Sequence, residues 1–197
     1  MAYRRSGDEM RCLDIGPGWE DERIKGFETL DVIERDNVDH VADASKPLPF
    51  EDAVFDIIYA SHVLEHIEWQ YTERTLREWV RILKNGGWLE VWVPNGLKAC
   101  HAFVEAERGN LSFVAKSPTW KYKIVDSDPC RFANGNIFSF TSGVDYPPWG
   151  LHKAMFSPRY LKSLFRKIGL KNVVEMDKKE VRAHHYRWIN LGIKGQK

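Results

Sequence analysis

The chain has 197 residues, of which 43% are hydrophobic and 29% are charged, and its formal net charge is +1. These values predict one soluble globular domain with no electrostatic reason to bind nucleic acid or an acidic membrane, and no apolar run is long enough to span a bilayer. The cysteines, Cys12, Cys100 and Cys130, are odd in number and far apart, which argues against disulfide and zinc frameworks and favours a reducing, cytoplasmic compartment.

The first predicted element is a strand over 11–15 that ends at the turn Gly16-Pro17-Gly18. Glycine allows backbone conformations that other residues avoid and lets the backbone approach a ligand closely. A strand that leads into such a turn is typical of nucleotide sites. The polar stretch that follows, 20–26, is short and predicts at most a brief helix.

The second strand is predicted over 27–33 and the third over 40–42. Asp31 lies at the end of the second strand, 17 positions past Asp14, where an acidic side chain can accept hydrogen bonds from a ribose diol. Asp43 follows the third strand directly. The proline-rich stretch 46–50 is predicted to be a loop, because proline cannot pair in a central strand.

The fourth predicted strand, 53–60, is almost continuously apolar, as expected for a strand buried on both faces of a parallel sheet. Asp56 interrupts it, and we expect this side chain to brace backbone at the rim of the sheet. Ser61 opens the next loop. A helix is predicted over 69–83, ended by Asn-Gly-Gly at 85–87, and a fifth strand over 88–93.

This alternation of strands with turns and a helix predicts an α/β fold with a doubly wound sheet. Ligands bind such sheets beyond the carboxyl ends of the strands, where the strand order reverses. The glycine turn, Asp31, Asp43 and Ser61 all lie at the C-terminal ends of predicted strands. We therefore expect them to meet around one ligand.

Together these stretches resemble the class I S-adenosylmethionine-dependent methyltransferases, in particular the methyltransferase type 11 group. The similar segments are 13–18, 30–32, 42–44, 48–50, 55–66, 78–87, and 156–161 through 169–170. The resemblance implies a Rossmann-like, mostly parallel, seven-stranded sheet with an insertion after the fifth strand. It also implies a single domain over 1–197, with an antiparallel closing strand over 181–193.

The resemblance implies S-adenosylmethionine as cofactor and S-adenosylhomocysteine as product. In that family pattern Asp31 takes the ribose hydroxyls, Asp43 accepts from the adenine amine, and Asp14 braces the turn or reaches the cofactor's amino group. Carboxylates and carbonyls suit these roles because the cofactor offers a diol and two amino groups as donors. The implied cofactor-binding residues are Asp14, Gly16, Gly18, Asp31, Val32, Asp43, Ala44, Ser61 and His62.

Positioning supplies much of the acceleration of methyl transfer, and a base is needed only if the acceptor keeps its proton. Among the histidines we favour His66, because it is close to the cofactor segment, and His152, because it follows an insertion. This insertion, 95–151, begins with a predicted helix over 98–108 and is rich in aromatic residues. Such a segment is typical of a lid or an acceptor-binding element, and it suits a sugar or an aromatic small molecule. No metal is expected.

The stretch 145–149, Asp-Tyr-Pro-Pro-Trp, resembles a motif of nucleic-acid methyltransferases, but it follows the fifth strand instead of the fourth. We interpret it as a proline-rich turn. The sequence thus predicts a cytoplasmic enzyme that methylates a small molecule or carbohydrate at oxygen, without nucleic acid or a membrane span; a homodimer stays open.

Two alternatives also stay open. A methyltransferase-like binding or scaffold protein is compatible with Glu20, which stands where the family commonly has a third glycine. An NAD-dependent oxidoreductase on a similar sheet is less favoured, because position 21 is Asp21 and the third glycine of the dinucleotide pattern is missing.

Overall fold

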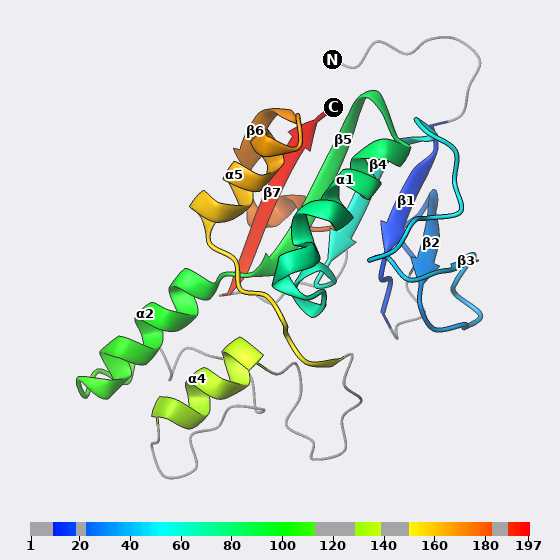
Figure 1. Cartoon of the computed structure of the whole chain (residues 1–197). Helices are drawn as coiled ribbons and strands as arrows, with labels where there is room; N and C mark the ends of the chain where they lie inside the picture. The colour runs from blue at the N-terminus through cyan, green and yellow to red at the C-terminus, as the bar shows by residue number, and fades with distance from the viewer. Residues whose placement is uncertain (1–9, 19–22, 113–128, 139–149, 183–188) are drawn as a thin grey trace.

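The computed structural model describes residues 10–18, 23–112, 129–138, 150–182 and 189–197 (Figure 1). Their strands form one seven-stranded sheet in the order β3-β2-β1-β4-β5-β7-β6. Of these strands, β7 runs antiparallel to its neighbours and the others are parallel. The strands are β1 (Cys12–Ile15), β2 (Phe27–Asp31), β3 (His40–Val41), β4 (Phe55–Ser61), β5 (Leu83–Pro94), β6 (Lys171–Glu175) and β7 (Asn190–Gln196). The predicted Rossmann-like fold is confirmed.

The described α-helices fall into two pairs. One pair, α1 and α5, packs on one face of the sheet, and the other pair, α2 and α4, lies side by side away from it (Figure 1). The other face of the sheet is covered by a smaller cluster of Tyr59, Trp92 and Met176. The helices are α1 (Thr72–Ile82), α2 (Gly96–Glu107), α4 (Pro129–Phe138) and α5 (Pro158–Lys167), with 3₁₀ turns at Leu64–His66, Trp69–Tyr71 and Lys178–Glu180.

Several predicted boundaries are wrong. The second strand, predicted to end at 33, ends at Asp31, and the fifth, predicted over 88–93, runs over Leu83–Pro94. The helix predicted to reach 83 and to end at 85–87 ends at Ile82, because Leu83 already pairs with Phe55 in the sheet. Carbonyl groups at the C-terminal end of this helix accept hydrogen bonds from a residue far away in the chain. The Lys197 ammonium donates to the carbonyls of Val80 and Leu83, both at 2.7 Å. The closing strand predicted over 181–193 begins only at Asn190 and continues to Gln196, antiparallel as expected.

The first crossover agrees with the prediction as far as it is described, since residues 23–26 form no helix; residues 19–22 lie outside the described residues. The helix predicted at the start of the insertion is α2. The proline-rich turn at 145–149 lies outside the described residues.

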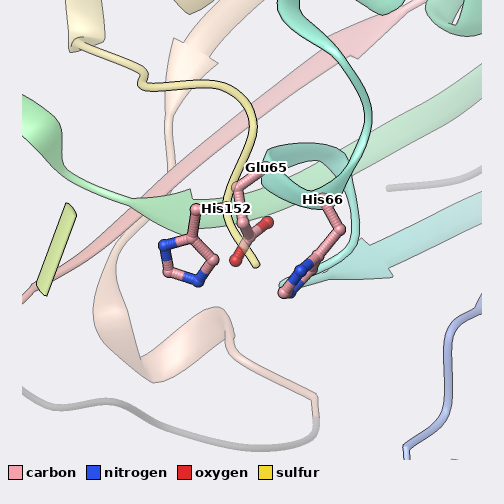
Figure 2. Close-up of side chains that lie close together, drawn as sticks. All are labelled: Glu65, His66 and His152. Carbon is pink, nitrogen blue, oxygen red and sulfur yellow. The ribbon is translucent and has the colours of Figure 1, made fainter. Parts of the chain in front are cut away.

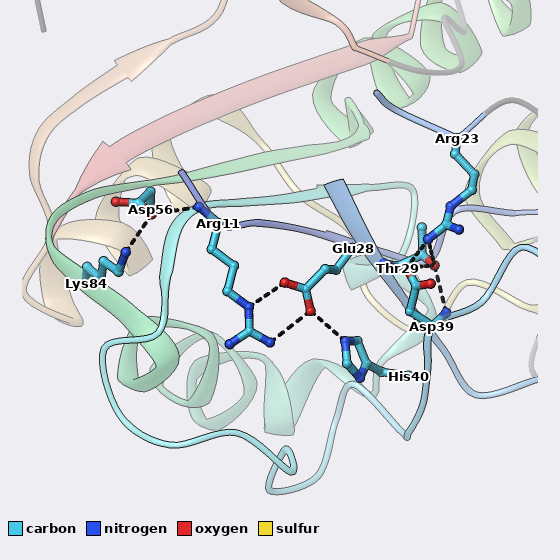
Figure 3. A network of polar contacts seen from close by, with 8 residues as sticks. All are labelled: Arg11, Arg23, Glu28, Thr29, Asp39, His40, Asp56 and Lys84. Atoms are coloured by element: carbon cyan, nitrogen blue, oxygen red, sulfur yellow. Dashed lines mark hydrogen bonds and ion pairs between the residues drawn. The ribbon is translucent and has the colours of Figure 1, made fainter. Parts of the chain in front are cut away.

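Ion pairs join the strands at the amino edge of the sheet (Figure 3). The Arg11 guanidinium binds both carboxylate oxygens of Glu28, whose Oε2 also lies 2.8 Å from His40 Nε2. Asp56 accepts from the Arg11 backbone N–H at 2.9 Å and from Lys84 Nζ at 2.7 Å, which confirms its expected bracing role. An open depression of about 580 Å³ lies at this same edge, away from the carboxyl ends where the glycine turn lies.

Helix α1 holds the proline-rich loop against the sheet through one arginine. The Arg81 guanidinium pairs with both oxygens of Glu78 and donates to the carbonyls of Phe50 and Leu48 at 2.8 and 3.2 Å. Glu78 in turn accepts from the Leu48 N–H at 2.7 Å. The loop therefore takes its shape from charge-assisted hydrogen bonds that begin on the helix.

We expect Arg81→Ala to lower the free energy of unfolding by about 1–3 kcal/mol, because it leaves loop carbonyls without their donor. The matched control is Arg77→Ala, which removes an exposed pair with Glu73 on the same helix and should cost no more than about 0.5 kcal/mol. Urea unfolding of both variants measures the difference. Equal losses in the two variants would contradict this account.

Candidate functional site

The candidate site lies where the strand order reverses. The chain runs from β1 outward to β2 and β3 and then places β4 on the other side of β1. The loops after β1 and β4 therefore leave the sheet side by side at its carboxyl edge. In open α/β sheets this crevice is the usual ligand site.

The glycine turn follows β1 and is held tightly. Gly16 and Gly18 have φ values of +74° and +77°, in the region that favours glycine. The Gly16 N–H donates to the Leu30 carbonyl at 2.8 Å, which ties the turn to the end of β2. A Cβ on Gly16 would overlap the Val63 side chain in the loop after β4. Glycine is thus required at position 16 both by conformation and by space.

Two acidic side chains lie together beside this turn. Asp14 is only 3% exposed, and burial, with a further contribution from the negative charge of Asp31, raises its pKa to about 7. The Asp31 side chain is 12% exposed, and it accepts from the Ile33 N–H at 2.9 Å. The structure therefore brings two of the predicted cofactor residues within electrostatic reach of each other.

The sequence analysis missed Arg35, which joins these groups. Its guanidinium Nη1 donates to the Gly18 carbonyl at 2.9 Å and to Asp31 Oδ2 at 3.3 Å. The spacing of an acid and an arginine four residues apart was visible in the sequence, but the intervening residues do not form a helix, so the spacing alone did not place Arg35 at the turn.

The segment after β3 lies on the same edge. The Ala42 N–H donates to the Asp31 carbonyl at 2.9 Å, and the Ala44 carbonyl accepts from Trp79 Nε1 of α1 at 3.0 Å. Asp43 is exposed, and its Oδ1 accepts from the backbone and hydroxyl of Ser45. Val32, at the tip of β2, is 57% exposed. The adenine and ribose roles of these residues stay predictions.

The remaining predicted cofactor residues lie at the end of β4 and just after it: Ser61, predicted to open the loop, is the last residue of β4 and pairs with Trp92, and His62 follows it. The His62 backbone has φ of +58° and donates to the Trp92 carbonyl at 2.9 Å. Its ring bridges two elements: Nδ1 lies 2.9 Å from Glu65 Oε1 and Nε2 lies 3.1 Å from Asn190 Oδ1. The His62 side chain therefore supports neighbouring groups, which leaves its backbone as the part that could face a ligand.

The two histidines favoured as bases lie together, although they are far apart in the chain. Their ring centroids are 5.0 Å apart, and Glu65 lies with them (Figure 2). The N–H groups of Lys153 and Ala154 donate to the Glu65 carbonyl at 2.7 and 3.0 Å, which brings His152 beside His66. The sequence analysis missed Glu65, because only this backbone pairing reveals the cluster.

Charge within the cluster is partly balanced. Burial lowers the pKa of His152, so its ring is held toward the neutral form. Burial alone would raise the pKa of the Glu65 carboxyl, but the neighbouring histidines, His62 first, hold it below its usual range. Residues of these types can accept a proton or bind a metal ion.

Much of the aromatic part of the insertion lies outside the described residues, including Trp120, Tyr122, Phe140, Tyr146 and Trp149. Within the described part, the Phe138 side chain at the end of α4 is 58% exposed. The acceptor-binding role of the insertion stays a prediction.

Residues 13–91 match the family model of a methyltransferase domain. A SAM-dependent methyltransferase from Thermotoga maritima is similar over 98% of this chain and 84% of its own, with 19% identity and a TM-score of 0.53. The CurJ carbon methyltransferase is similar over 98% of this chain and 49% of its own, with 16% identity and a TM-score of 0.52.

A third similar structure is the 1,6-didemethyltoxoflavin-N1-methyltransferase of Burkholderia thailandensis, solved with S-adenosylhomocysteine bound. The likeness covers 95% of this chain and 70% of that one, with 13% identity and a TM-score of 0.51. No curated protein matches the sequence. At these identities the solved structures show a shared fold, and the matched segment 13–91 contains the glycine turn, both acids and the loop after β4.

We expect Gly16→Ala to destabilise the protein by more than the roughly 1 kcal/mol that a positive φ alone costs alanine, because its methyl group would also displace Val63. The control is Gly86→Ala, with φ of +82° and open space around it. The melting temperature should fall further in Gly16→Ala than in Gly86→Ala. S-adenosylhomocysteine should raise the melting temperature of Gly86→Ala but not that of Gly16→Ala. Equal behaviour of the two variants would refute the packing argument.

The raised pKa of Asp14 predicts a pH-dependent stability. Between its ordinary value of 3.8 and about 7 the folded protein keeps a proton that the unfolded chain has lost, so this group lowers stability as the pH rises through that window. The cost is at most about 4 kcal/mol above pH 7. We expect the stability gain of Asp14→Asn over wild type to grow from pH 4 to pH 7 in urea unfolding. The exposed Asp36→Asn should show no such trend.

Proposed function

We propose that this chain, which carries a methyltransferase domain of the class I, S-adenosylmethionine-dependent family, transfers a methyl group to an oxygen atom of a small molecule or glycan. The single observation that carries the proposal is the meeting of the glycine turn, the acid pair and the loop after β4 at the point where the strand order reverses. These are the groups to which the resemblance assigns the binding of S-adenosylmethionine.

The cofactor would lie along the carboxyl edge from β4 to β3. Asp31 would accept from the ribose diol, and the exposed Asp43 would accept from the adenine amine beside the Ala44 backbone. The turn at Gly16 and Gly18 would approach the methionine part of the cofactor. An ammonium group near Asp14 would favour the ionised carboxylate, so binding would recover part of the free energy that burial of this acid costs.

The acceptor would approach from the side of the insertion, where His66 and His152 lie. An oxygen–methyl bond forms as the sulfur–methyl bond breaks, and the electron pair stays on sulfur to give S-adenosylhomocysteine. A hydroxyl acceptor must also lose its proton, and the neutral ring of His152 is a suitable base. The presence of this candidate base supports oxygen as the methylated atom.

The net charge of +1 offers little attraction to a polyanion, which supports an acceptor other than nucleic acid. No described helix has the length and apolar character needed to cross a bilayer. The proposal also includes a cytoplasmic location and a single domain over 1–197. It makes no choice between a monomer and a homodimer.

The test is ligand binding followed by turnover. S-adenosylhomocysteine should raise the melting temperature and NAD should not, and Asp31→Asn should weaken S-adenosylhomocysteine binding by about 10- to 100-fold in calorimetry, because a charged acceptor is worth roughly 1.5–3 kcal/mol. The exposed Asp36→Asn serves as the matched control. Stabilisation by NAD instead would favour the oxidoreductase, and stabilisation by neither would favour the scaffold protein.

A further inference from the structure

The strongest unused feature of the molecule is the buried carboxylate between the two histidines. Glu65 is 1% exposed, and its Oε1 is held by His62 Nδ1 at 2.9 Å. Its Oε2 is buried and has no hydrogen-bond partner among the described residues. A buried oxygen of this kind costs free energy unless something binds it. Figure 2 shows the carboxylate between the rings of His66 and His152.

The three side chains converge closely enough to share one ion. One ligand atom from each of Glu65, His66 and His152 lies within 4.8 Å of the others. A tetrahedral ion with bonds of about 2.0–2.2 Å keeps its ligand atoms about 3.3 Å apart. Binding of an ion would draw these ligand atoms closer together by side-chain rotation.

Each of these side chains also makes a hydrogen bond to a group outside the three-residue cluster. His66 Nδ1 lies 3.2 Å from the Leu151 carbonyl, an arrangement that puts the proton on Nδ1 and leaves Nε2 free to bind a metal. The backbone of Ile137 hydrogen-bonds to His152. His62 holds Glu65 and is itself anchored at 3.1 Å by Asn190. Such second contacts orient ligands at metal sites.

We propose that Glu65, His66 and His152 bind one divalent transition-metal ion of the Zn²⁺ type. Two imidazoles and one carboxylate form a common three-ligand set for zinc, which leaves a fourth position open. Mg²⁺ and Ca²⁺ fit this set less well, because they prefer oxygen ligands. No metal was expected from the sequence, where the spacing of the three cysteines argues against a zinc framework.

The role of the ion rests on the proposed function. The open position would take the acceptor hydroxyl, and the ion would lower the pKa of that hydroxyl so that its proton passes to solvent before the oxygen attacks the methyl group. His66 and His152 would then be ligands and not bases. Metal binding itself does not depend on this step.

The experiment measures Zn²⁺ binding to the full chain after treatment with a chelator. We expect one Zn²⁺ per chain in calorimetry, at least 10-fold weaker binding of Mg²⁺, and a loss of Zn²⁺ affinity of at least 100-fold in Glu65→Gln and His152→Ala. His66→Gln, at a less buried position, is a third variant in case a buried substitution impairs folding. The exposed His101→Ala is the matched control and should bind Zn²⁺ as wild type does.

Substitution of Co²⁺ for Zn²⁺ distinguishes metal binding at this cluster from metal binding at the cysteines. A nitrogen and oxygen site gives no thiolate charge-transfer absorption, whereas binding at Cys100 or Cys130 does. Unchanged Zn²⁺ binding in all three variants, or a thiolate spectrum, would overturn the metal site even if methyl transfer is observed. Zn²⁺ binding that depends on the cluster in a chain that fails to bind S-adenosylhomocysteine would support the metal site and refute the proposed function.

Discussion

Gly16 and Val63 pack so closely that position 16 has room for hydrogen alone. This contact joins the loops that leave two neighbouring parallel strands, β1 and β4, at the one place where the order of the sheet reverses. The Gly16 N–H is bound by the Leu30 carbonyl and the Gly18 carbonyl by Arg35, so the turn is held in a fixed shape at the carboxyl ends of the strands. The rest of the candidate site is arranged around this approach.

The charges around the turn are arranged at a cost to the unliganded protein. Asp14 and Asp31 repel each other in a poorly hydrated place, and Arg35 offsets part of that repulsion from the Asp31 side while it also holds the Gly18 carbonyl. A ligand with hydroxyl and ammonium donors would satisfy the same acceptors. Functional sites commonly contain such energetically unfavourable groups, and ligand binding relieves part of their cost.

Distant parts of the chain hold the site in place. Trp79 of α1 fixes the Ala44 carbonyl in the segment after β3, and β7 brings Asn190 against His62. The backbone of Glu65 pairs with 153–154 and so carries His152 to the end of β4. At the amino edge, ion pairs among charged side chains join neighbouring strands.

The sequence by itself determined the parallel sheet, the glycine turn and the acids at the strand ends, because hydrophobic runs, glycine and strand-end acids act over a few neighbouring residues. It placed the end of α1 and the start of β7 wrongly, since those boundaries depend on pairing with Phe55 and β5, which lie far away in the chain. Only the tertiary structure brought Arg35 to the turn and Glu65, His66 and His152 together. Backbone hydrogen bonds between residues more than eighty positions apart made that cluster, and no local pattern records them.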